Sequence, residues 1–158
     1  MKMSTLNINS NSILQQQRGA AAVEFALVII PLLLIVAGII EFGRTFWYYD
    51  ALAKSTRDAA RYVSNTRVSP VVGVNDTIKD NAKLMVVNAV NAAKVPSFAT
   101  GNVSVVCDPV DCIAPNYVTV SITGYTIPIG GWIPIIFYTG TKSWVARPAP
   151  ATTMRYMQ

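Results

Sequence analysis

The chain of 158 residues has no histidine, only two cysteines and only eight acidic residues. Histidine is the usual general base and the commonest metal ligand, so its absence weighs against acid–base catalysis and against a metal centre. The acidic residues are scattered, and the sequence has no glycine-rich phosphate loop, no nucleophile elbow and no internal repeat. We therefore expect no enzymatic activity, no cofactor and no metal site.

Basic residues outnumber acidic ones by 13 to 8, which gives a net charge of +5. They are dispersed along the chain, and after Cys112 there are three basic residues and no acidic one. This density is too low for a groove that binds a nucleic-acid backbone. We expect no nucleic-acid partner, and we interpret the basic residues as solvated surface or as weak contacts with anionic lipid.

The segment from Arg18 to Glu41, RGAAAVEFALVIIPLLLIVAGIIE, contains a long apolar run at residues 20–40. As a helix, residues 20–40 would be about 31 Å long at ~1.5 Å per residue, close to the ~30 Å hydrocarbon core of a bilayer. Pro31 is expected to kink this helix, which membrane helices tolerate. The run predicts a single transmembrane helix.

The residues on either side of the run indicate its orientation. Lys2 and Arg18 precede it without any acidic residue, so the positive-inside rule places the N-terminus in the cytoplasm. Trp47, Tyr48 and Tyr49 follow the run where an aromatic belt would meet the far interface. The chain beyond residue 50 is then expected outside the membrane.

Glu24 is the only charged residue among the 21 from Ala20 to Ile40. A carboxylate costs on the order of 2.5–3.5 kcal/mol at the centre of a membrane span, and less near the interface. Three other interpretations of the run are a secretory signal peptide cut near residues 36–38, an uncleaved single-pass anchor and a buried helix of a soluble protein. A plain anchor has no use for Glu24, whereas a subunit that pairs with a positive group inside the membrane does.

Gly19 stands between a polar, basic leader and the apolar run. A protease that cuts after Gly19 would leave a new amino group on Ala20 and make Glu24 the fifth residue. The Glu24 carboxylate would then pair with the Ala20 ammonium of a neighbouring subunit and set the stagger between the two, because opposite charges attract strongly in a low dielectric. This pattern resembles the class III signal of type IV prepilins, and Glu24-Phe25 resembles the Glu-Tyr or Glu-Phe pair of the Flp/Tad branch.

The resemblance extends beyond this signal. The segment RGAAAVEFALVIIPLLLIVAGIIEFGRTFWYYDALAKSTRDAARYVS resembles the N-terminal motif of TadE-like proteins, with matching stretches at residues 18–26, 31–33, 38–44 and 56–62. Asp58-Ala59 departs from this pattern, since Glu-Gly or a similar pair is frequent there. The closely matching part covers about a third of the chain.

This resemblance implies a minor pseudopilin of a tight-adherence (Flp pilus) assembly system, embedded in the bacterial inner membrane with its C-terminal domain in the periplasm. Implied partners are the prepilin peptidase, the major Flp pilin, other pseudopilins, the inner-membrane assembly platform and membrane lipid. The peptidase would recognise and cut the signal through Gly19, Ala20, Glu24 and Phe25. The alternative is an uncleaved inner-membrane anchor, a structural subunit of a secretion complex.

These arguments divide the chain into a cytoplasmic leader (1–19), a transmembrane helix (20–41), a helical stalk outside the membrane (42–66) and a small extracytoplasmic domain (67–158). In the stalk, apolar and small residues recur at spacings of three and four, namely Phe42, Phe46, Tyr49, Ala53, Thr56, Ala60 and Val63. This stripe is either the core face under the extracytoplasmic domain or a surface that also packs against other pilin-like helices.

The last part predicts an α+β domain with a pilin-like layout. After a linker at residues 67–75, residues 76–94 predict a second, shorter helix whose apolar face comprises Ile78, Ala82, Met85, Val86, Ala89 and Ala93. Alternating residues predict strands at 102–107 and 117–125, and a last strand is expected within 141–156, broken near Pro148 and Pro150. We expect a small antiparallel sheet of about three strands.

Cys107 and Cys112 lie in the expected turn between the first two strands. An oxidising periplasm favours a disulfide between them, which would act as a hairpin staple. A metal site is disfavoured because two thiols leave the ligand set incomplete, and nothing in the sequence supports a redox switch.

The segment IPIGGWIPIIFY, residues 127–138, is apolar but rich in glycine and proline. It is either a loop that completes the core or an exposed patch that meets a partner or the membrane surface. In the second case Trp132, Ile133 and Ile136 would carry the contact.

Overall fold

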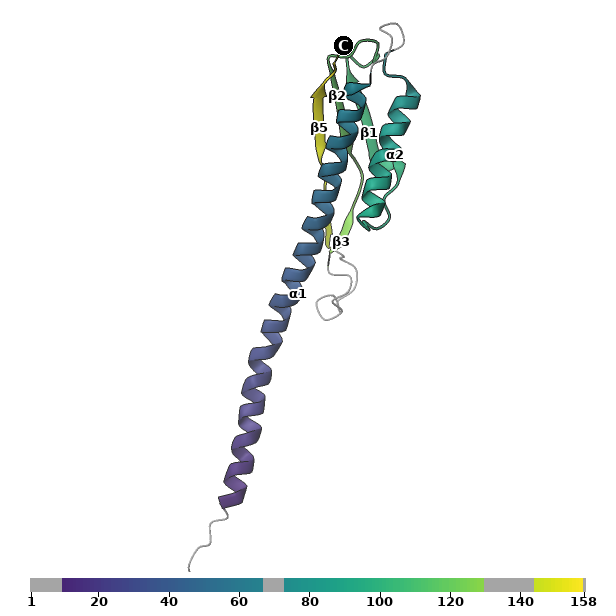
Figure 1. Cartoon of the computed structure of the whole chain (residues 1–158). Coiled ribbons are helices and arrows are strands. Elements are labelled where there is room, and N and C mark those ends of the chain that lie inside the picture. Colours follow the sequence, from purple (N-terminus) through teal and green to yellow (C-terminus); the bar gives the residue numbers. More distant parts are fainter. Residues whose placement is uncertain (1–9, 67–72, 130–143, 158) are drawn as a thin grey trace, which may run out of the picture. The chain divides into compact units, whose positions relative to one another are not determined.

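The computed structural model describes residues 10–66, 73–129 and 144–157 of the chain (Figure 1). The chain forms two compact units, Met1–Ile40 and Glu41–Gln158. The long helix α1 (Ser10–Asn65) contributes to both units, and it begins ten residues before Ala20, where the sequence predicted the helix to start.

In the first unit the described backbone is that of α1, and Pro31 lies inside the helix without interrupting it. From Gly19 to Ile40 every side chain is exposed except Ile29 and Ala37, which are half-buried. This segment is long and apolar enough to cross a bilayer, and none of its most apolar 18-residue window is buried in the protein. It therefore fits the single span of a single-pass membrane protein.

The second unit contains a three-stranded antiparallel sheet in the order β1-β2-β5, formed by β1 (Val103–Asp108), β2 (Tyr117–Ile122) and β5 (Ala151–Arg155). A second antiparallel pair joins β3 (Ile127–Ile129) to β4 (Trp144–Ala146). A short 3-10 helix, η1 (Thr100–Asn102), precedes β1. With α2 (Asp76–Ala92), these elements confirm the expected α+β fold and the break in the last strand.

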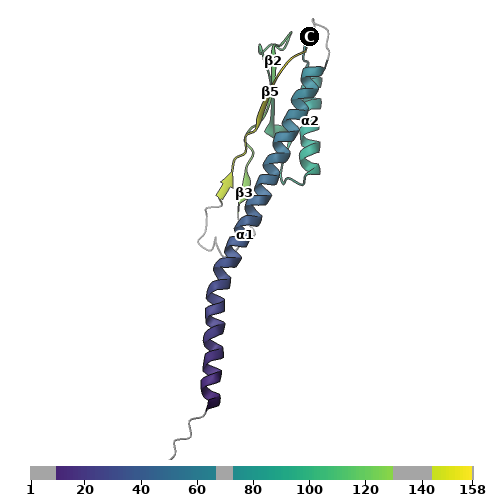
Figure 2. The same cartoon turned by 60° about the vertical axis from the view of Figure 1, so that its left-hand side comes forward.

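Both helices of the second unit lie on the same face of the three-stranded sheet (Figures 1 and 2). The expected alternation along β2 is confirmed, because Val118, Val120 and Ile122 are buried while Tyr117 and its alternate neighbours are exposed or half-buried. The buried side chains of β2 meet those of α1 and α2 in one core, whose largest fully buried members include Leu52, Val63, Val86, Val90, Val118, Val120, Ile122 and Ile127.

The packed face of α2 differs in part from the expectation. Ile78, Ala82 and Val86 are buried as predicted, but Met85 and Ala89 are exposed. Val90, which was not expected to be buried, is in the core. The buried residues of α2 are four positions apart, because the helix turns this line of side chains toward the sheet. The predicted face instead combined spacings of three and four residues.

The predicted stripe on α1 is also only partly the core face. Thr56, Ala60 and Val63 are buried, but Phe42, Phe46 and Tyr49 are exposed. The line of buried and half-buried side chains at the start of the second unit runs one position earlier, through Glu41, Thr45, Tyr48 and Leu52.

The C-terminal end of the chain caps the end of α1. The main-chain N–H of Met157 donates to the carbonyl of Ser64 at 3.1 Å, and the Tyr156 hydroxyl donates to the carbonyl of Thr66 at 2.6 Å. The first bond satisfies a carbonyl group that the helix end would otherwise leave without a partner.

Candidate functional site

Gly19, the expected cleavage position, lies on α1 in the first unit and is exposed. A Cβ atom built on Gly19 would meet nothing within 4 Å. Glycine in a helix interior costs about 1 kcal/mol relative to alanine, and the fold of this chain offers no packing reason for it here. Gly38 and Gly43 on the same helix likewise have nothing within 4 Å of a built Cβ atom.

Glu24 lies one helical turn after Ala20 and is exposed between apolar neighbours. Val23, Phe25, Leu27 and Val28 are each exposed by about two-thirds. No hydrogen bond or ion pair joins the Glu24 carboxylate to a residue in the described parts of the chain. The structure thus brings Ala20, Glu24 and Phe25 onto one exposed helical segment, with a single carboxylate in an otherwise apolar surface.

A second acidic residue, Glu41, was not singled out by the sequence analysis. Glu41 is 5% exposed, and its Oε1 lies 2.6 Å from Nη2 of Arg44. The Arg44 guanidinium also lies 6.0 Å from the centre of the Tyr48 ring. The spacing of three residues between two opposite charges, directly after the apolar run, is the signal that predicts this pair.

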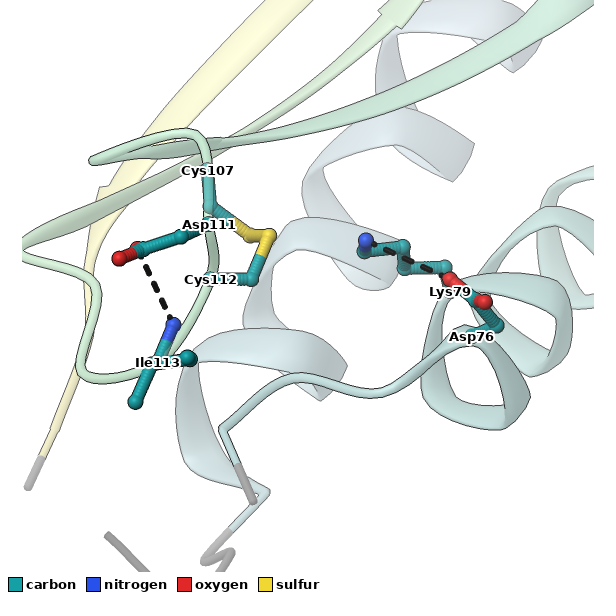
Figure 3. Close-up of a disulfide and its surroundings, with 6 residues drawn as sticks. All are labelled: Asp76, Lys79, Cys107, Asp111, Cys112 and Ile113. Atoms are coloured by element: carbon teal, nitrogen blue, oxygen red, sulfur yellow. Dashed lines mark hydrogen bonds and ion pairs between the residues drawn. A yellow bond between two sulfur atoms is a disulfide. The ribbon is translucent and has the colours of Figure 1, made fainter. Parts of the chain in front are cut away.

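The expected disulfide is present, and it joins Cys107 on β1 to Cys112 in the loop before β2 (Figure 3). The two Cα atoms are 5.3 Å apart and both residues are buried. Hydrogen bonds within the loop run from Cys112 N to Pro109 O, from Asn116 N to Asp108 O and from Ile113 N to Asp111 Oδ1. The cysteine pair therefore acts as the predicted hairpin staple.

Two expectations, the linker and the possible partner patch, cannot be compared fully with the structure. Residues 67–72 of the linker, and Trp132, Ile133 and Ile136 of the apolar segment, lie outside the described residues. In the parts of the chain that are described, no group of three or more acidic or cysteine side chains is placed to hold a metal ion.

Comparison with known proteins gives one match. The family model described as TadE-like protein matches residues 19–61, which contain Gly19, Glu24 and the Glu41–Arg44 pair. This match agrees with the resemblance stated from the sequence. Searches of curated proteins and of solved structures returned no match to the chain.

Proposed function

We propose that this chain, whose residues 19–61 match the TadE-like family, is a minor pseudopilin that acts in assembly of a Flp/Tad-type pilus. It acts by helix packing and protein–protein contacts in the inner membrane, with its N-terminus in the cytoplasm and its second unit in the periplasm. The family match supports an association with the Tad pilus. The peptidase, the major pilin, the other pseudopilins and the assembly platform are the partners that this role requires.

The observation that carries the proposal is the isolated carboxylate of Glu24, five residues after an exposed Gly19. The cost of placing this carboxylate in a membrane is offset if a positive group lies beside it. Cleavage after Gly19 creates such a group, the Ala20 ammonium of the next subunit. Pairing Glu24 with that ammonium shifts the two helices by four residues, which is about 6 Å of helical rise.

Mass spectrometry of the mature polypeptide tests the proposal directly. A chain that begins at Ala20 supports the pseudopilin. A chain that still begins at Met1 supports the alternative, an uncleaved single-pass anchor in a secretion complex. A chain that begins near Ile39 would indicate conventional secretion and would contradict both.

Two substitutions separate processing from assembly. Gly19→Val is expected to block cleavage, whereas Gly38→Val is the matched control, because Gly38 is also an exposed helical glycine with nothing within 4 Å of a built Cβ. Glu24→Ala is expected to leave cleavage intact and to reduce piliation. Glu24→Asp is expected to give more piliation than Glu24→Ala. Normal piliation in a Glu24→Ala strain would remove the role assigned to this carboxylate.

A further inference from the structure

The first two turns of α1 in the second unit carry their polar side chains inward and their apolar side chains outward. Glu41 is buried, and Arg44, Thr45 and Tyr48 are half-buried. Four aromatic side chains on the other side of the helix are 46–74% exposed, namely Phe42, Phe46, Trp47 and Tyr49. A helix on the surface of a protein in water shows the opposite arrangement. We call these four residues the aromatic collar.

The collar is wide. At ~100° per residue its members span about 160° of the helix circumference, from Tyr49 through Phe42 and Phe46 to Trp47. The inward residues occupy the opposite arc, of about 100°, from Arg44 to Thr45. One packed neighbouring helix covers a stripe of roughly 100° or less. The width of the collar therefore fits a surrounding medium better than a single protein partner.

The polarity of this side of α1 changes within one turn. Tyr49 is the last aromatic residue on it, and Asp50 and Lys54, which follow, form an ion pair of 2.6 Å. Farther along, the same side presents three exposed charged residues, Arg57, Asp58 and Arg61. A change from aromatic to charged side chains on one helix face is the pattern of a boundary between lipid and water.

We propose that the aromatic collar lies in the headgroup layer of the membrane, and that water begins at Asp50 and Lys54. The collar follows the apolar run directly in the sequence. From Phe42 to Tyr49 the helix rises about 10 Å, compared with roughly 5–8 Å for the interfacial layer on each side of the hydrocarbon core. The indole of Trp47 and the phenol of Tyr49 have the amphipathic character that favours this layer.

The inference changes the belt expected from the sequence. Tyr48 leaves the belt, because it is half-buried and turned toward the protein with Arg44. Phe42 and Phe46 enter it, with their rings stacked at 6.5 Å between centroids. The Glu41–Arg44 pair then lies at the same depth as the headgroups but faces the protein. The inference rests on membrane insertion, which the proposed function also requires, and it does not depend on cleavage or on pilus assembly.

Depth-dependent quenching of Trp47 fluorescence tests the inference. The full chain, with Trp132→Phe and Trp144→Phe so that Trp47 is the only tryptophan, is reconstituted into vesicles of phosphatidylethanolamine and phosphatidylglycerol. Brominated lipids are expected to quench Trp47, more strongly with bromine on shallow acyl carbons than on deep ones. Aqueous iodide is expected to quench it weakly. Strong quenching by iodide without quenching by bromolipid would overturn the inference, and so would protection from both quenchers, which would indicate a protein neighbour.

Two further variants of this chain, each also carrying Trp47→Phe, move the single tryptophan to another position. They show whether a negative result concerns the collar or membrane insertion. Arg57→Trp places the reporter on the charged part of the same side and is expected to be quenched by iodide. Leu33→Trp places it in the exposed apolar run and is expected to be quenched by deep bromine. If Leu33→Trp responds to bromolipid and Trp47 does not, the collar inference fails while insertion holds. If neither responds, membrane insertion itself is wrong.

If the chain with Trp132→Phe and Trp144→Phe does not fold, the wild-type chain can be compared with Trp47→Phe instead. Trp47 is 63% exposed, so Trp47→Phe alone leaves the core intact. The bromolipid-dependent loss of emission in the wild-type chain is expected to decrease in Trp47→Phe, with the shallow component affected most. An unchanged loss would contradict the inference.

Discussion

The main-chain N–H of Val74 donates a hydrogen bond of 2.8 Å to the carbonyl oxygen of Cys112. Val74 immediately precedes Asn75, whose side chain caps α2 by accepting a bond from the N–H of Ile78 at 3.0 Å. Cys112 belongs to the disulfide loop between β1 and β2. The loop therefore holds the entrance to α2 in place, and the next two predictions follow from this contact.

Gly73→Ala is expected to destabilise the second unit. Gly73 has φ of +61°, and a Cβ there would overlap the backbone of Cys112. Gly124→Ala is the matched control, because Gly124 has φ of +68° but a Cβ there would meet nothing within 4 Å. We expect about 1 kcal/mol for the backbone conformation at Gly124, and a loss at Gly73 that exceeds it by about 1–3 kcal/mol for the overlap. Urea unfolding of the full chain in detergent measures both, and equal losses would show that the contact with Cys112 does not matter.

The double substitution Cys107→Ser and Cys112→Ser is expected to lower the free energy of unfolding by about 2 kcal/mol, because the disulfide closes a loop of only a few residues. The same change should follow the addition of a reductant to the wild-type chain. The double variant is the control, since a reductant should leave its unfolding curve unchanged. A destabilisation of the variant by reductant would point to an effect unrelated to this disulfide.

Glu41→Ala is expected to cost more stability than Asp50→Ala, although both remove the acid of an ion pair on α1. The Glu41 side chain is 6% exposed and that of Asp50 is 46% exposed. Loss of a buried, hydrogen-bonded acid costs about 1–3 kcal/mol, whereas an exposed pair contributes about 0.5 kcal/mol or less. Thermal unfolding in detergent compares the two variants, and similar losses would contradict the difference in burial.

Much of the fold could be predicted from the sequence because its signals are local. The apolar run, the alternation along Tyr117–Ile122 and the spacing of Cys107 and Cys112 are each read from one continuous segment, and the structure has a helix, an alternating strand and a disulfide at these places. What failed was the choice of helix face. Phe42 and Phe46 have the spacing of a core stripe, but the side that becomes buried depends on where the sheet lies, which the spacing does not contain.

The candidate site shows the same limit. Glu24 and Gly19 could be singled out because a lone charge lies inside the apolar run and a glycine stands at the boundary between the polar leader and that run. Glu41 was missed because it stands at the end of that run, where a charged residue is ordinary. Its burial arises from the fold of the second unit, and so does the inward position of Tyr48. Neither could be read from the local pattern, because the side of α1 that becomes covered depends on the fold of the second unit.

The last prediction concerns the pH dependence of stability. Tyr125 is 4% exposed, its hydroxyl donates to the carbonyl of Pro96 at 2.7 Å, and its ring meets that of Phe98 edge-on at 5.2 Å. Burial, with a smaller contribution from Tyr48, raises the pKa of the Tyr125 phenol above its ordinary value of 10.0. The folded chain thus holds this proton more tightly than the unfolded chain does.

The sign of the effect follows from that difference. Stability contributed by the protonated phenol is fully present below the unfolded pKa of about 10, and it is lost as the pH rises from there through the folded pKa, at no more than about 1.4 kcal/mol per pH unit. Tyr125→Phe removes the titration together with the bond to Pro96, so at neutral pH it should be less stable than the wild-type chain by about 1 kcal/mol. The difference between the two chains is the informative quantity, because contributions common to both cancel in it. Unfolding free energies measured between pH 8 and about pH 11 should therefore converge, because the wild-type chain loses what the variant already lacks. Parallel curves would show that the Tyr125 proton is not linked to folding.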